Sequence, residues 1–226
     1  MPWIGLFLAV LLLWLAYRLL RAAARAPHAD WGDALSNRIA GFVSLFCRRL
    51  HGLDCEPLPL PETGAALVVA NHMSGLDPFL LIAASPRPLR FLIAREEYER
   101  FGLRWLFRRA GCIPVDRDRR PEKALREALV ALKQGDVVAL FPHGKIHLDS
   151  DPPRKLKGGA VRLAQKMELP IYPVRLDDVR GAGHVFLSLL LPSQARLKAW
   201  PPLECNGLDH EHCLALLAQR LEPGDG

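Results

Sequence analysis

The sequence predicts an α/β fold, with a mixed and mostly buried β-sheet flanked by helices and a membrane-associated helical segment at the N-terminus. Short apolar runs alternate with helix-like stretches from residue 65 onward, which is the pattern of a sheet covered by helices. The first 20 residues are almost entirely apolar. With 226 residues and a hydrophobic fraction of 50%, the chain can bury the core of one ordinary domain.

The N-terminal apolar segment reads WIGLFLAVLLLWLAYRLL from Trp3 to Leu20. Its uninterrupted part ends at residue 17 and is short of the roughly 20 residues that span a bilayer, but Arg18 can extend it by snorkelling. Arginines follow the segment and none precedes it, which disfavours a secretory signal peptide. The same asymmetry predicts a membrane protein whose following domain stays on the cytoplasmic face. A buried core helix is the alternative.

Residues 34–50 predict a helix, because apolar residues recur there at helical spacing: Leu35, Ile39, Phe42, Phe46 and Leu50. Its arginines would suit anionic headgroups, whereas packing on the domain core explains the same apolar face. We therefore expect membrane-anchoring helices in residues 1–56 and an α/β domain in residues 57–226. Pro57, Pro59 and Pro61 mark the linker between them.

Within the second unit, apolar runs and turn residues give the expected order of elements. We expect strands at 65–70, 89–94, 137–141, 171–176 and 184–191, with another near 196–200. We expect helices at 78–84, 121–134, 159–167 and 209–221. Pro78 and Pro121 suit a first helical turn.

The net charge limits the classes of partner that this chain is expected to bind. A net charge of +6 suits nucleic acid, an anionic membrane or anionic substrates. No nucleic-acid-binding motif is present, so we expect a phospholipid membrane as partner and no nucleic acid.

Five cysteines without a CxxC pair predict free, mostly buried thiols. His210 and His212 lie two apart on a predicted helix and point in different directions, so we expect no metal there.

The segment Asn71–Asp77 directly follows the strand expected at 65–70. A histidine and a carboxylate five residues apart on such a turn can form a general base, His72, and its orienting partner, Asp77. Two simpler interpretations stay open. His72 suits a hydrogen-bonded turn, and Asp77 before Pro78 suits a helix N-cap.

Three further motifs follow in order. Gly111–Arg117 ends in a cation that suits phosphate, although the surrounding charges also fit a solvated cluster. Phe141-Pro142-His143-Gly144-Lys145-Ile146-His147 follows the strand expected at 137–141, and Ile171-Tyr172-Pro173-Val174 lies in another strand. Lys157 and Gly158 directly precede the helix expected at 159–167. A glycine beside a cation at a helix N-terminus suits an anion-binding site, although a merely basic surface fits the same residues.

These four motifs, from about residue 67 to 176, resemble the glycerolipid acyltransferase family, most closely the 1-acylglycerol-3-phosphate acyltransferases. The resemblance implies transfer of a fatty acyl chain from acyl-CoA or acyl-carrier protein to the hydroxyl of lysophosphatidic acid, with no resident cofactor. It implies His72 as general base and Asp77 as its orienting residue. It also implies a set of substrate-binding residues: Asn71, Arg117, His143, Gly144, Lys145, Lys157 and Gly158.

The third motif departs from the family form, Phe-Pro-Glu-Gly-Thr-Arg-Ser. Here His143 replaces the glutamate and Ile146 replaces the arginine. The acceptor is therefore left open between lysophosphatidic acid and another lysophospholipid or lyso-aminolipid, such as lyso-ornithine lipid. A non-catalytic membrane scaffold is a further alternative. A serine hydrolase is disfavoured because no Gly-x-Ser-x-Gly elbow occurs.

Overall fold

The computed structural model describes residues 2–26, 29–116 and 121–222, and within these residues seven strands form one sheet. Their spatial order is β1-β7-β6-β2-β5-β3-β4, and only the β6–β7 pair is antiparallel. The predicted mixed α/β fold is confirmed. The strands are β1 (Asp54–Cys55), β2 (Ala66–Ala70), β3 (Leu89–Ala94), β4 (Ile113–Val115), β5 (Val137–Leu140), β6 (Ile171–Asp177) and β7 (Arg196–Ala199).

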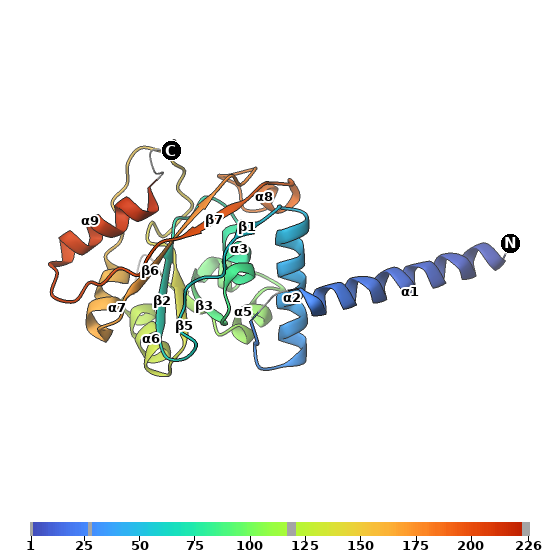
Figure 1. Cartoon of the computed structure of the whole chain (residues 1–226), viewed down its shortest axis with the longest axis horizontal. Helices are drawn as coiled ribbons and strands as arrows, with labels where there is room; N and C mark the ends of the chain where they lie inside the picture. Colours follow the sequence, from blue (N-terminus) through green and yellow to red (C-terminus); the bar gives the residue numbers. More distant parts are fainter. Residues whose placement is uncertain (1, 27–28, 117–120, 223–226) are drawn as a thin grey trace.

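Helices cover both faces of this sheet (Figure 1). Those that the structure describes are α1 (Pro2–Arg25), α2 (Ala34–Arg49), α3 (Asp77–Ala84), α4 (Arg95–Tyr98), α5 (Arg104–Arg109), α6 (Pro121–Lys133), α7 (Gly159–Met167), α8 (Leu187–Leu190) and α9 (His210–Leu221). Helices α2 and α3 share one core cluster with the sheet, and α6, α7 and α9 share the other.

Strand β2 shows why this region is so apolar in sequence. Its side chains alternate between the two clusters: Ala66, Val68 and Ala70 face α2 and α3, and Leu67 and Val69 face the other layer. A strand that lies between two parallel neighbours and two helical layers needs apolar residues at every position. Because β5 and β6 flank β2 in parallel, the loops that leave their carboxyl ends lie together.

One predicted strand is wrong. Residues 184–191 do not join the sheet but form a turn followed by α8. Ser188 stabilises this turn, because its hydroxyl donates to the carbonyl oxygens of His184 and Val185. The position beside β6 is taken by β7, which pairs Val174 with Ala199.

Several short elements were absent from the prediction: β1, α4, α5, α8 and β4 within the second motif. Pro114 is accommodated in β4 because this strand lies at the edge of the sheet.

The prediction that all cysteines are free is also wrong. Cys205, in the loop before α9, forms a disulfide with Cys213 of the first helical turn, across a Cα–Cα distance of 5.7 Å. The loop before α9 turns back toward the helix and brings the two cysteines together, which their spacing of eight did not reveal.

Helix α1 projects away from the domain (Figure 1). It is long and apolar enough to cross a membrane, and none of its most apolar window is buried, so the alternative of a buried core helix is wrong. Where α1 meets α2, a Cβ on Gly41 would lie 2.2 Å from the carbonyl oxygen of Ala23. The buried face of α2 consists of small residues, namely Ser36, Ala40, Gly41, Ser44 and Cys47.

The larger apolar residues predicted for that face are therefore not its most buried ones. Leu35 is 44% exposed, and Ile39, Phe42 and Phe46 are half-buried. Helix α2 packs on both α1 and α3. It thus contacts the domain core through one stripe, while Leu35 is left exposed near its start. The boundary between residues 56 and 57 stays a prediction.

Candidate active site

His72 and Asp77 form a direct pair. His72 Nδ1 lies 2.8 Å from Asp77 Oδ2, in the loop between β2 and α3. A carboxylate only accepts hydrogen bonds, so Nδ1 of the neutral imidazole carries the proton and Nε2 keeps its lone pair. The His72 side chain is 18% exposed, whereas Asp77 is fully buried. This is the geometry of a histidine prepared to accept a proton at Nε2.

Asp77 is held by three further donors. Its Oδ2 accepts from the backbone N–H groups of Met73 (2.6 Å) and Ser74 (2.8 Å), and its Oδ1 accepts from the Ser74 hydroxyl (2.6 Å). These donors precede α3 instead of lying in its first turn, and the N-cap residue is Leu76. The alternative that Asp77 serves as a helix N-cap is therefore wrong: its carboxylate organises the turn that carries His72.

Asn71 connects this turn to β6. Its Nδ2 donates to the carbonyl oxygen of Leu176 (2.9 Å), and its Oδ1 accepts from the Leu176 N–H (2.7 Å). The side chain is only 3% exposed. The amide thus fixes where the loop leaves the sheet, and its expected contact with substrate stays a prediction.

The third motif packs directly on His72. The ring of Phe141 stacks on the imidazole with centroids 4.1 Å apart, and the His147 N–H donates to the His72 carbonyl oxygen (2.8 Å). The neighbouring strands β2 and β5 therefore bring the two motifs together, as their predicted positions require.

His143 is half-buried beside His72, and its ring lies 4.5 Å from that of His147. Burial lowers the pKa of His143 to about 4, and electrostatic repulsion of its protonated form by the neighbouring His147 and Arg154 acts in the same direction. The ring is therefore neutral at neutral pH. Its Nδ1 is buried and has no partner among the described residues. Where the family form has a carboxylate, this chain places an uncharged group with an unused hydrogen-bonding nitrogen.

Gly144 and Lys157 lie in contact. Gly144 has a φ of +74°, and a Cβ there would come within 2.7 Å of Lys157 Nζ. The Lys157 N–H donates to the Pro142 carbonyl oxygen (2.9 Å), so the chain returns to the third motif just before α7. Gly158 is tightly covered too, since a Cβ there would meet His210 Nε2 at 2.4 Å. Three of the residues expected to bind substrate, Gly144, Lys157 and Gly158, thus lie close together with His210, and their contact with substrate stays a prediction.

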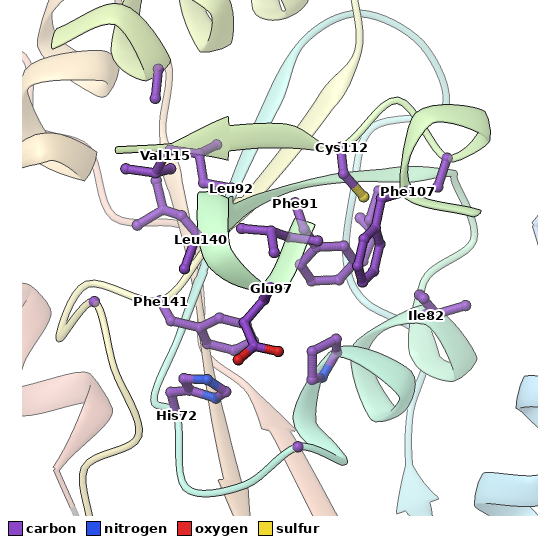
Figure 2. A pocket seen from close by; sticks show the side chains of 18 of the residues that line it. His72, Ile82, Phe91, Leu92, Glu97, Phe107, Cys112, Val115, Leu140 and Phe141 are labelled. Carbon is purple, nitrogen blue, oxygen red and sulfur yellow. The ribbon is translucent and has the colours of Figure 1, made fainter. Parts of the chain in front are cut away.

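A cavity of about 1020 Å³ connects these motifs to the interior. It reaches His72, Gly144, Lys145, Lys157 and Gly158, and continues between α2, α3, β3 and α5. Figure 2 shows His72 and Phe141 at one side of it and Ile82, Phe107 and Cys112 at the other. Most of its lining is apolar, so it suits a long hydrocarbon chain that ends beside the imidazole.

Sequence reasoning did not find this cavity, because its walls come from elements far apart in the chain. The apolar contributors include Ile39, Val43, Phe79, Phe91 and Leu106. Arg117, expected to bind phosphate, lies outside the described residues. Among the described residues, no three His, Cys, Asp or Glu side chains are grouped to hold a metal ion.

A buried arginine holds the loop of the third motif to the sheet. Arg175 of β6 is 4% exposed and pairs with Asp149 and with Asp177, whose Oδ1 lies 2.9 Å from Nε. It also donates to the carbonyl oxygen of Leu221 at the end of α9. The loop between β5 and α7 is therefore anchored both to His72 and to Arg175.

The fold and the site define an α/β domain with a His–Asp pair at the opening of a long apolar cavity. A model of the acyltransferase family matches residues 55–177, just over half of the chain, so the chain belongs to that family. The crystal structure of the 1-acyl-sn-glycerophosphate (LPA) acyltransferase PlsC from Thermotoga maritima has the same fold, with a TM-score of 0.64 and 20% identity. The match covers 92% of this chain and 86% of that one.

Two curated relatives are similar in sequence. The probable 1-acyl-sn-glycerol-3-phosphate acyltransferase of Mycoplasma pneumoniae is 34% identical over 157 residues, which cover 66% of this chain and 57% of that protein. The N-acylphosphatidylethanolamine synthase of Arabidopsis thaliana is 32% identical over 185 residues, or 72% of this chain and 63% of that protein. The chain thus spans less than two thirds of the length of either relative.

Proposed function

We propose that this chain is an acyltransferase that moves a fatty acyl group from a thioester to the hydroxyl of a lysophospholipid, with lysophosphatidic acid as the first candidate acceptor. The observation that carries the proposal is the His72–Asp77 pair at the opening of the apolar cavity. Relatives named as 1-acyl-sn-glycerol-3-phosphate acyltransferases support this acceptor. The donor is acyl-CoA or acyl-carrier protein.

In the proposed reaction, Nε2 of His72 takes the proton of the acceptor hydroxyl while its oxygen attacks the thioester carbonyl. Asp77 holds the Nδ1–H and stabilises the imidazolium that forms, as the aspartate does in a Ser-His-Asp triad. The carbon–sulfur bond then breaks, and the thiolate takes the proton back from Nε2. No acyl-enzyme forms, because the substrate hydroxyl replaces the serine.

The basic side chains around the cavity supply binding energy for the headgroup. Lys145, Lys157 and Arg162 line the same cavity as His72. An ammonium or guanidinium group at this opening would attract the phosphate of the acceptor or of the donor. Arg117 remains a proposed phosphate ligand on the resemblance alone.

His143 leaves a second acceptor class open, because the carboxylate of the family form is missing from the third motif. A neutral imidazole in place of a carboxylate removes a negative charge next to the reacting hydroxyl. The relative named N-acylphosphatidylethanolamine synthase makes a product acylated on nitrogen. We therefore propose lysophospholipid diesters and amine-bearing lipids as the alternative acceptors.

The experiment offers acyl-CoA and acyl-carrier protein to the purified chain with lysophosphatidic acid, lysophosphatidylethanolamine, phosphatidylethanolamine and lyso-ornithine lipid as acceptors. Turnover confined to lysophosphatidic acid supports the first proposal, and preference for another acceptor supports the second. No turnover with any acceptor by the folded protein would favour a non-catalytic scaffold.

We also propose that α1 anchors the domain on the cytoplasmic face of the membrane. The support is the exposed apolar surface of α1 and the arginines that follow it, including Arg21 and Arg25. Protease added to right-side-out vesicles should spare the α/β domain, whereas inverted vesicles should expose it. The opposite result would contradict this orientation.

A further inference from the structure

Two surface segments of the α/β domain expose large apolar side chains. Phe101, in the turn before α5, is completely exposed, and Trp105, in α5 itself, is 55% exposed. In the segment leading into α8, Phe186 is 61% and Leu190 is 74% exposed. Among the described residues after Leu50, every exposed large hydrophobic side chain except Val130 belongs to these two segments. Such clustering marks an interaction surface, whereas isolated apolar residues would not.

The two segments form one surface, which we name the aromatic–arginine surface: residues 100–109 together with residues 185–190. The guanidinium of Arg100 lies over the ring of Phe186, 5.3 Å from its centroid, and so joins them. Both segments also line the cavity of the active site, through Leu103 and Phe186 among others. The surface therefore surrounds part of the cavity opening.

This surface lies beside α2, the helix on which α1 packs. Arg109 of α5 donates to the Ser36 hydroxyl near the start of α2 (2.8 Å) and pairs with Asp33. At the other end of α2, the backbone around Leu189 of α8 contacts His51. Figure 1 accordingly shows α5 and α8 next to opposite ends of α2. Both segments of the aromatic–arginine surface therefore contact the region of α2.

The charge of this surface identifies its partner. Arg104 and Arg108 are exposed on α5 next to Trp105, whose ring also lies 5.7 Å below the Arg109 guanidinium. Aromatic rings with arginines suit the headgroup region of a bilayer, and the arginines suit its anionic lipids. An acidic protein would satisfy the arginines, but it would leave the fully exposed Phe101 without a hydrocarbon environment.

We propose that the aromatic–arginine surface inserts into the headgroup region of an anionic phospholipid bilayer, as a second membrane contact separate from α1. The contact turns the cavity opening toward the lipid phase, where hydrophobic substrates reside. It does not depend on the acyl-transfer proposal, because it concerns only where the domain sits on the bilayer.

The test uses the full chain in nanodiscs of phosphatidylcholine and phosphatidylglycerol that carry nitroxide-labelled lipid. An environment-sensitive fluorophore is attached to a cysteine introduced by Phe101→Cys or Leu190→Cys. Ala215→Cys, at an exposed position of α9, provides the control position. The signal from label on the native cysteines is measured with the parent chain and subtracted. We expect lipid quenching at 101 and 190 to exceed that at 215 by at least about twofold. Trp105→Cys provides a second position if Phe101→Cys does not fold.

Equal quenching at 101, 190 and 215 would overturn the proposal, and so would quenching at only one of the two segments. A fluorescence change at both positions on adding acyl-carrier protein, without lipid quenching, would assign the surface to that protein instead. Arg104→Gln with Arg108→Gln should remove about half or more of the quenching at 101 in anionic discs. The matched control, Arg126→Gln on α6, should leave it unchanged, and equal effects would contradict the electrostatic part.

Discussion

At the scale of single residues, the buried Asp77 carboxylate both shapes a turn and orients His72. Asp77→Asn removes the charge that stabilises the imidazolium and replaces one acceptor by a donor facing two backbone N–H groups. We expect the acyl-transfer rate to fall by about 10²–10⁴. We also expect the free energy of unfolding to fall by about 1–3 kcal/mol. Both are measured on the purified variant.

Ser74→Ala is the matched control. It removes the hydroxyl bond to Asp77 Oδ1 but leaves the His72–Asp77 pair intact. Its stability should fall by about 1 kcal/mol, and its rate should change far less than that of Asp77→Asn. Equal loss of rate in both variants would mean that Asp77 acts through the turn alone.

His143 should make the protein sensitive to acid. Its pKa is about 4 in the folded chain and 6.5 ordinarily, because burial, followed by the electrostatic effects of the neighbouring His147, Arg154 and His72, disfavours its protonation, against an opposing effect of Asp149. Between these values the unfolded chain binds a proton that the folded chain does not, so stability falls as the pH drops from 6.5 to 4. The Tm of His143→Gln should fall less steeply over this interval. Parallel Tm curves would contradict the assignment.

At the scale of elements, the crossing of α1 and α2 depends on Gly41. A methyl group there would overlap the backbone of Ala23, at 2.2 Å from its oxygen. We expect Gly41→Ala to force the helices apart at a cost of about 1–3 kcal/mol. Spin labels at Leu19 and Arg38 should report a longer and broader distance distribution. Gly5→Ala has nothing within 4 Å and should leave the distribution unchanged. An unaltered distribution in Gly41→Ala would rule out this close contact.

The anchor of the third-motif loop is a second prediction at this scale. Arg175→Met leaves Asp149, Asp177 and the Leu221 carbonyl without their donor. Because both carboxylates are about 40% exposed, we expect the free energy of unfolding to fall by only about 1–3 kcal/mol. Each kcal/mol lowers the Tm by roughly 2–4 °C in a chain of this size. The exposed pair of Arg196 and Asp178 provides the control, Arg196→Met, with a change near zero. Similar Tm values for both variants would contradict an anchoring role.

Local signals predicted much of the fold and the core of the site. The buried strands β2, β3, β5 and β6 follow from short apolar runs, and the His72–Asp77 contact follows from five-residue spacing on one turn. Contacts between distant segments were not predictable in this way. The ion pair of Arg175 with Asp149 and the packing of Lys157 on Gly144 depend on how strands and loops meet in space.

The errors have the same origin. The apolar run at 184–191 was assigned to the sheet, yet four of its large apolar side chains are exposed on the surface: Val185, Phe186, Leu187 and Leu190. An apolar run reports that its residues avoid water, but it does not distinguish a core from a membrane-facing surface. The disulfide between Cys205 and Cys213 also depends on the path of the loop into α9.

At the scale of the whole molecule, two exposed apolar features, α1 and the aromatic–arginine surface, both contact α2 or the residues that flank it. The cavity that contains His72 is lined by residues of α2 and of that surface. With the aromatic–arginine surface in the bilayer as proposed, a substrate with a long hydrocarbon chain reaches the imidazole without passing through water. The central claim is that His72 is the base at the end of this path.

The most direct test is the single-turnover rate of acyl transfer in nanodiscs for the parent chain, His72→Ala and His212→Ala, using the best acceptor from the panel. His212 is an exposed histidine on α9 and controls for loss of a histidine. We predict a loss of about 10²–10⁴ for His72→Ala and a rate close to that of the parent chain for His212→Ala. A folded His72→Ala variant that transfers acyl groups at the parental rate would contradict the account.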